Sequence, residues 1–218
     1  KANLDYWGPH KEMMMQQAVA LVKSTVGGRS DLTGHVSKTG YARVGSARLG
    51  MLAASYGMTR TDKSPKEAIE KTSSQFYEGY VLGWFVADGS VQGSQLKGVS
   101  VRLSSNSLSG LKTAQRMLAR IGIISSVFEN RRDGQYRMLP DGKGGMKSYF
   151  CAANHELLIQ GANLATFSAR IGFSDPAKSQ KLKTILSNYK RELNGERFST
   201  VVSSIMSAGF EDVYDCTV

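Results

Sequence analysis

The sequence predicts an α+β fold, in which helices alternate with short antiparallel strands. Two observations support this prediction. Apolar residues recur at helical spacing in several segments, and they alternate with polar residues in others, as in "VSVRLS" at 99–104. Two blocks, 10–58 and 107–173, also follow the same order of helix, strand, strand and helix. Hydrophobic residues make up 41% of the 218 positions, which is enough for a substantial core.

The first block predicts a compact helix-hairpin-helix unit. Its expected elements are a helix at 9–25, strands at 32–38 and 41–46 joined by a tight turn, and a helix at 47–57 that Gly57 closes. Nothing in residues 1–9, "KANLDYWGP", predicts a regular element.

The second block is preceded by two further elements and followed by a basic helix. The expected elements are a helix at 76–89 after a polar segment with Pro65, a strand at 96–105, a helix at 107–122, a strand at 123–132, a turn-rich stretch at 133–145, a strand at 146–152, a helix at 154–173 bent around Gly161, a helix at 175–190 and strands in the tail around Gly209. The closing helices of the two blocks align, with Leu49 over Leu164 and Gly57 over Gly172. The chain therefore predicts one full unit and the later part of another.

Composition points to an anionic partner. The net charge is +10 and the isoelectric point is about 9.6, which favours nucleic acid or a membrane surface as partner. No apolar run is long enough to span a membrane, and the N-terminus does not have the pattern of a signal peptide. The two cysteines, Cys151 and Cys216, and three scattered histidines argue against a zinc site or a disulfide scaffold and favour a reducing, intracellular setting.

The stretch "YVLGWFVADGS" at 80–90 carries the most specific chemistry. Gly79, Gly83 and Ala87 fall on one helix face, and each interior glycine costs about 1 kcal/mol relative to alanine, so we expect a second helix to pack closely there. Asp88 at the helix C-terminus opposes the helix dipole, and a divalent cation would offset that cost. Two such helices would bring two carboxylates together. The simpler alternative is an Asp-Gly turn after a core helix.

The whole string resembles the signature of the LAGLIDADG homing endonucleases. Leu82, Gly83, Ala87, Asp88 and Gly89 stand where that motif needs them. "FEDVYDCTV" at 210–218 is similar to a strand near the end of inteins. "LPDGKGGMKSY" at 139–149 and "IGFSDPAKSQKL" at 171–182 resemble inteins of cobalamin-dependent (class II) ribonucleotide reductases.

This resemblance implies αββαββα repeats whose sheets form a saddle on DNA. It predicts a partial first repeat at 1–75, a full repeat at 76–190 and truncated C-terminal strands of an intein splicing (Hint) domain at 191–218. It also implies that Asp88 binds a catalytic Mg²⁺ with the carbonyl of Ala87, and that Lys143 or Lys147 supports catalysis near the scissile phosphate. Gly79, Gly83 and Ala87 would form the helix interface.

The saddle is expected to bind double-stranded DNA through strand faces opposite the apolar ones, where a β-ribbon can enter the major groove. The candidate DNA-binding residues are Arg43, Ser100, Arg102, Ser104, Arg131, Arg132, Arg137 and Lys147. Each alone is more typical of a solvated charge or a phosphate contact than of a residue that reads a base.

The implied function is that of a homing endonuclease, which hydrolyses phosphodiester bonds with a metal and makes a double-strand break in the intein-free allele. Only one motif is present, so the second aspartate is expected from another polypeptide or a dimer, or has been lost. Lys1 and the ending at Val218 lack the terminal groups of protein splicing. The alternatives are a catalytically incomplete DNA-binding remnant and a C-terminal piece of a split intein that acts with an N-terminal intein fragment. The expected location is the cytoplasm of a prokaryotic or phage host, without membrane attachment.

Overall fold

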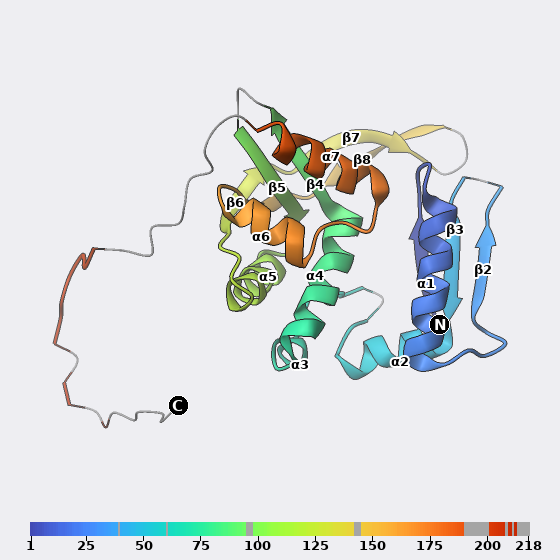
Figure 1. Ribbon diagram of the computed structural model, residues 1–218, viewed down its shortest axis with the longest axis horizontal. Helices are drawn as coiled ribbons and strands as arrows, with labels where there is room; N and C mark the ends of the chain where they lie inside the picture. The colour runs from blue at the N-terminus through green and yellow to red at the C-terminus, as the bar shows by residue number, and fades with distance from the viewer. Residues whose placement is uncertain are drawn as a thin grey trace.

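The computed structural model describes residues 1–38, 40–59, 61–94, 98–141, 145–189, 201–207, 209–210 and 212. The first unit consists of β1 (Ala2–Tyr6), α1 (Lys11–Val26), β2 (Thr33–Val36), β3 (Ala42–Ser46) and α2 (Ala47–Ser55), and it forms one side of the molecule (Figure 1). Its three-stranded antiparallel sheet has the order β1-β3-β2.

The second unit follows the short helix α3 (Glu67–Glu70). It consists of α4 (Ser74–Asp88), β4 (Gly89–Ser94), β5 (Gly98–Ser105), α5 (Leu108–Arg120), β6 (Ser126–Arg132), β7 (Gln135–Pro140), β8 (Met146–Cys151), β9 (Asn154–Ile159) and α6 (Asn163–Arg170). The last helix, α7 (Pro176–Ser187), packs beside β4. The strands β4-β5-β9-β6 form one antiparallel sheet, while β7 and β8 form a separate two-stranded arm that extends from it (Figure 1).

The two units share one topology. β1 pairs with β3 as β5 pairs with β9, and each of these first strands leads to the helix that packs on its own sheet. β2 and β6 likewise pair with the other edge of β3 and β9. Within the described residues, β1, α1, β2, β3 and α2 of the first unit therefore match β5, α5, β6, β9 and α6 of the second, and the first unit has no counterpart of α4, β4 or the β7–β8 arm.

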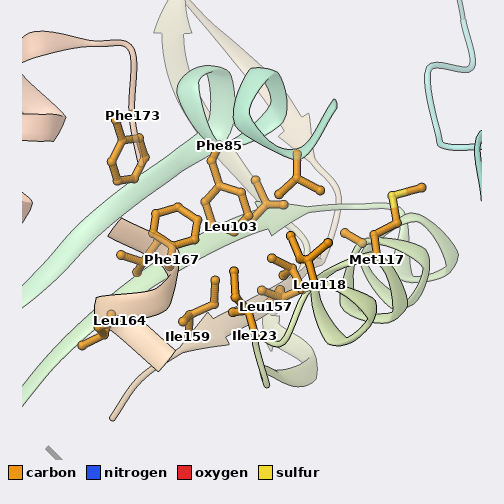
Figure 2. Packing of buried hydrophobic residues seen from close by; sticks show 14 of the residues in the cluster. Phe85, Leu103, Met117, Leu118, Ile123, Leu157, Ile159, Leu164, Phe167 and Phe173 are labelled. Atoms are coloured by element: carbon orange, nitrogen blue, oxygen red, sulfur yellow. The ribbon is translucent and has the colours of Figure 1, made fainter. Parts of the chain in front are cut away.

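The larger core belongs to the second unit. Phe85, Leu103, Met117, Leu157 and Phe167 lie at its centre with no or almost no exposed surface (Figure 2). They come from α4, α5, α6 and one face of the four-stranded sheet, because alternate strand residues point to the same side. The opposite face of this sheet carries none of these helices.

The first unit buries a smaller set of side chains from α1 and β3. This set consists of Met14, Ala18, Val22, Ala42 and Val44. The helix α1 covers one face of the sheet, so the other face stays open as in the second unit.

Three sequence-based predictions were wrong in detail. Residues 2–6, where the sequence predicts no regular element, form the strand β1. The stretch 133–145 contains the strand β7 because its residues pair with β8, and 154–159 is the strand β9 although it was predicted to be helical. Cross-strand pairing outweighs local helix propensity at "NHELLI".

The structure also bears on the strands predicted in the tail and on the membrane prediction. Residues 201–207 adopt no helix or strand, so the strands predicted there are absent from that segment. The similarity to an intein strand at 210–218 and the candidate Lys143 lie outside the described residues, apart from Phe210 and Asp212. Among the described residues, no helix is long and apolar enough to cross a membrane.

Candidate functional site

The helix α4 presents its residues in distinct rows. Tyr77, Val81 and Phe85 face the core at four-residue spacing. Ser73 caps the first turn by accepting a hydrogen bond from the backbone N–H of Phe76, at 3.3 Å. Gly89 follows the helix directly, and a Cβ there would collide with the carbonyl oxygen of Phe85. Glycine at position 89 is therefore a steric requirement of this packing, whereas the exposed Asp88 is not.

The row opposite the core carries the small residues. Gly79, Gly83 and Ala87 are all exposed, and a Cβ added at either glycine would have no atom within 4 Å. The close helix-helix contact that we predicted from the glycine spacing is therefore not made within the described part of this chain. The face is instead open along the helix.

Asp88 ends the next row and is exposed. Its Oδ2 atom accepts a hydrogen bond from Nε1 of Trp84 at 3.2 Å, which holds the carboxylate against the helix. A polar groove of about 330 Å³ opens beside it. The groove is lined by the segment Thr61–Ser64, by Trp84 and Asp88, and by Ser105–Ser107.

A second carboxylate, that of Asp62, lines the same groove. A side-chain hydrogen bond from Lys66 lowers its pKa to about 2, and backbone N–H donation from Ser64 at 3.0 Å contributes to the same shift. Asp62 is therefore ionised and already paired. Within the described residues, no group of three or more histidine, cysteine or acidic side chains could hold a metal ion.

These residues provide only part of a metal site. One exposed carboxylate, from Asp88, stands at the helix end with the carbonyl of Ala87 beside it. Oxygen donors of this kind suit Mg²⁺, but Mg²⁺ requires more donors than one carboxylate and one carbonyl, and bound water supplies the balance only in part. The donor set fits a divalent ion when a further carboxylate comes from outside the described chain.

A lysine that the sequence did not suggest lies next to this end of α4. Lys178 of α7 donates a hydrogen bond from Nζ to the carbonyl of Val86 at 2.6 Å and so satisfies one of the terminal carbonyls of the helix. Burial lowers the pKa of Lys178, and the nearby carboxylates of Asp175 and Asp88 oppose that shift. The separation of Lys178 from Val86 along the chain leaves no local sequence signal for this contact.

The predicted cation Lys147 lies on β8 in the two-stranded arm. Its Nζ atom is 5.8 Å from the centre of the Tyr149 ring, and it is not among the residues that line the groove beside Asp88. Arg137 is exposed on the opposite strand of the same arm. The arm also exposes large apolar side chains, among them Tyr136 and Phe150, whose rings are 5.3 Å apart.

The open face of the second sheet carries the remaining candidates of the second unit. Arg102 and Ser104 are half-buried there, while Ser100 is buried and accepts a hydrogen bond from Nε of Arg102 at 3.0 Å. The acceptor that holds Arg102 in place is Glu156, at 3.1 Å from Nη1. The sequence reading missed Glu156 because it placed this residue in a helix.

At the edge of that face, β6 carries two more arginines. Arg131 lies 3.6 Å from the Glu156 carboxylate, and Arg132 is exposed beyond it. In the first unit, Arg43 lies on the corresponding open face but donates two hydrogen bonds to Asp5, at 2.5 and 2.7 Å. The Arg43 hydrogen bond lowers the pKa of Asp5, so this pair is fully charged and internally matched near neutral pH.

Comparison with known proteins assigns the fold of this site. Residues 75–172 match the family described as LAGLIDADG-like domain. The chain is 29% identical over 167 residues to ribonucleoside-diphosphate reductase NrdEB subunit alpha of Bacillus subtilis (strain 168) and to the corresponding protein of Bacillus phage SPbeta. The matched region spans 74% of this chain and only 15% of each relative. The predicted link to ribonucleotide reductases is confirmed, whereas dependence on cobalamin stays a prediction.

Solved structures agree with this assignment. The crystal structure of I-DmoI in complex with DNA and Ca has a TM-score of 0.53 at 13% identity and covers 84% of this chain and 82% of that one. A variant of the same enzyme with its target DNA and Mg has a TM-score of 0.50 at 14% identity, with 78% of both chains covered. The chain therefore has the α+β fold of a LAGLIDADG homing endonuclease, and its match to the LAGLIDADG-like domain spans residues 75–172.

Proposed function

We propose that this chain binds double-stranded DNA on the open faces of its two sheets and cleaves it with a second LAGLIDADG-type helix. The observation that carries this proposal is the position of Asp88. This exposed carboxylate ends a helix whose small-residue face is open to a partner. A net charge of +10 suits a polyanionic substrate.

The partner helix would complete the donor set. A second carboxylate brought along Gly79, Gly83 and Ala87 would stand next to Asp88, because small residues allow two helix backbones to approach closely. Mg²⁺ bound between such carboxylates would activate water and stabilise the leaving oxygen of a phosphodiester. The residues of this chain would hold one side of that ion through Asp88 and the carbonyl of Ala87. Trp84 would keep the carboxylate oriented, and Lys178 would fix the carbonyl row of the helix.

The reductase relatives suggest the target. We propose that the enzyme acts as the homing endonuclease of an intein and cuts the intein-free allele of a ribonucleotide reductase gene, within a prokaryote or a phage-infected cell. The partner would then be a second copy of this chain or an N-terminal intein fragment that carries the missing helix.

One observation favours a second function. The described residues hold a single carboxylate at the motif and no three-ligand cluster, which is also what a DNA-binding remnant without cleavage would have. Such a remnant would retain DNA recognition through the saddle and lose hydrolysis.

Cleavage of a plasmid that carries the intein-free reductase junction tests the two functions. The chain is incubated with Mg²⁺ or with EDTA, and Asp88→Asn is compared with Asp62→Asn, which changes the other carboxylate of the same groove. The endonuclease proposal predicts Mg²⁺-dependent linearisation that Asp88→Asn lowers by at least about a thousandfold, a size typical of lost charge stabilisation at a reacting centre, while Asp62→Asn retains most of it. Binding of the junction over random DNA without cleavage, even with a helix-bearing partner added, would establish the remnant instead.

A further inference from the structure

A buried carboxylate, that of Glu156, lies on the open face of the second sheet. The side chain of Glu156 is 4% exposed, although the neighbouring residue Leu157 points to the other face and into the core. A charged carboxylate withdrawn from water requires close partners. Its partners are the guanidinium groups of Arg102, at 3.1 Å, and Arg131, at 3.6 Å.

Each arginine has a further contact that fixes its plane. Arg102 also donates from Nε to Oγ of Ser100 at 3.0 Å, so two of its nitrogen atoms are held by the protein. The guanidinium of Arg131 lies over the ring of Phe128, 5.5 Å from its centre. Both arginines keep exposed surface, with 26% of the Arg102 side chain and 51% of the Arg131 side chain accessible.

The backbone is built to bring Arg131 to this position. The pairing of β6 with β9 is regular up to Phe128 and resumes at Arg132, so a bulge lies between them. Within it, Asn130 adopts a positive φ of 48° and its backbone N–H donates to Nδ1 of His155 at 3.0 Å. Bulges re-aim side chains, and an asparagine is one of the few residues that accept this conformation. Here the bulge turns Arg131 toward the same carboxylate that holds Arg102.

We propose that Glu156 is a positioning residue for sequence recognition, which holds Arg102 and Arg131 side by side so that their free N–H groups read guanine in the major groove. This inference rests on the proposed DNA-binding function. Two neighbouring guanidinium groups repel each other, and the shared carboxylate removes that repulsion. It also orders two flexible side chains before DNA arrives, which reduces the entropy lost on binding. The N–H groups that an arginine held in this way keeps free are suited to the O6 and N7 acceptors of guanine.

The matched control is Glu129, which lies on the same strand as Arg131. Its carboxylate is 53% exposed and pairs with Lys112 at 3.0 Å. Glu156→Gln and Glu129→Gln make the same change in net charge. Simple electrostatics therefore predicts equal effects for both variants, whereas positioning predicts an effect of Glu156→Gln alone.

The test is enrichment of random duplex DNA by the full chain and its variants, followed by measurement of positional base preference. We expect the wild-type protein to select a site with guanine at defined positions. Glu156→Gln should lower that preference about tenfold at one or two positions while overall affinity is maintained or increased, and Glu129→Gln should leave it unchanged. Arg131→Lys keeps the positive charge and removes the planar guanidinium, so it should lower the same base preference. If Glu156→Gln does not fold, this variant replaces it in the test.

The outcomes separate the two proposals. If the wild-type chain enriches no sequence, DNA recognition itself fails and the inference falls with it. If the wild-type chain selects a site and both glutamine variants select it equally well, the positioning role of Glu156 is overturned while DNA recognition stands. A uniform loss of affinity in Arg131→Lys, without a change of base preference, would assign the pair to phosphate contacts and also overturn the inference.

Discussion

The first and second units share a sheet topology and differ in what surrounds it. In both, a helix covers one face of an antiparallel sheet and the other face is open. The second unit adds α4, β4 and the two-stranded arm, and with α4 come Asp88, the small-residue face and the buried residues Tyr77, Val81 and Phe85. The shared part of the fold thus supplies a surface and most of the core beneath it, and the added helix supplies the candidate chemistry.

The open faces differ in charge organisation. In the first unit, Arg43 is matched by one carboxylate, that of Asp5, with two hydrogen bonds. In the second unit, Glu156 is shared by Arg102 and Arg131, so one positive charge remains in excess. The same sheet architecture therefore presents a neutral pair on one side of the molecule and a net cationic pair on the other.

The largest expected effect concerns the two cores. Phe85→Ala removes a fully buried ring that packs 4.9 Å from the ring of Phe167, and it should lower the free energy of unfolding by about 3–5 kcal/mol. Met14→Ala in the first unit should cost about 2 kcal/mol, the lower end for such truncations, because Met14 is 8% exposed and has a smaller core around it.

The two tryptophans allow each unit to be followed separately in urea. Trp7 lies in the first unit and Trp84 in the second, so Trp84→Phe and Trp7→Phe leave one fluorescent reporter each. Phe85→Ala should shift the transition that Trp84 reports more than the one that Trp7 reports. Equal shifts at both tryptophans would mean that the units unfold as one, and the comparison of separate cores would not hold.

The local sequence pattern was sufficient to predict most helices and strands and to find the motif. It was insufficient where pairing between distant strands determines the secondary structure. The apolar run from about Phe76 and its Asp-Gly ending predicted a helix that stops near Gly89, and α4 does end at Asp88. In contrast, "NHELLI" has a helix-compatible composition and becomes β9 only because β5 and β6 pair on both its sides. β1 was missed although Ala2, Leu4 and Tyr6 alternate with polar residues, because five residues give a weak signal without the partner β3.

The same limit applies to the site. The sequence suggested which residue types would face DNA, since alternation along β5 separates Arg102 from Val101 and Leu103. It could not show that Lys178 reaches Val86 or that Glu156 lies between two arginines, because these contacts join segments far apart in the chain. Side chains that act through other side chains leave no periodic pattern.

The next effect concerns the attachment of α3 to the second unit. Glu70 accepts two hydrogen bonds from Arg116 of α5, at 2.8 and 2.7 Å, and its side chain is 18% exposed. Glu70→Gln should lower the free energy of unfolding by on the order of 1 kcal/mol at pH 7, after allowance for solvent screening. Glu67→Gln, which changes an exposed carboxylate of the same helix, should have no measurable effect.

The contribution of Glu70 should depend on pH in one direction. The hydrogen bond from Arg116 lowers the pKa of Glu70 below its ordinary value of 4.5 in the folded chain. The stabilisation is therefore complete above about pH 4.5 and is lost as the pH falls through the lower, folded value. Urea unfolding of wild type and Glu70→Gln should differ most at neutral pH and converge in acid. A difference that persists at low pH would show that packing, and not charge, carries the effect.

A smaller increase in the free energy of unfolding is expected for a substitution on α4, the helix that the first unit lacks. Gly83→Ala should stabilise the isolated chain by up to about 1 kcal/mol, because alanine favours the helix and its Cβ meets no atom within 4 Å. Gly110→Ala in α5 is the control, since its Cβ would lie 3.0 Å from Ser107 Oγ and 3.1 Å from Trp84 and should gain nothing. Loss of stability in Gly83→Ala, together with a dimer mass in sedimentation, would mean that a partner already covers this face.

The smallest effect tests the charge difference between the two open faces. Affinity for DNA falls with salt in proportion to the number of phosphates that a protein neutralises. Arg131→Gln should reduce the slope of log affinity against log salt by about 1, because Arg131 shares its carboxylate with Arg102. Arg43→Gln should reduce it by less, because Asp5 already neutralises Arg43.

Asp5→Asn decides whether the matched pair causes that difference. It leaves Arg43 in place and removes its partner, so the salt slope should become steeper than in the wild-type protein and Arg43→Gln should then have the full effect in this background. Equal slopes for Arg43→Gln and Arg131→Gln in the wild-type background would show that DNA displaces Asp5 from Arg43 on binding. The open face of the first unit would then be as cationic toward DNA as that of the second, and the carboxylates on the two faces would differ in how they position arginine and not in how much charge they leave.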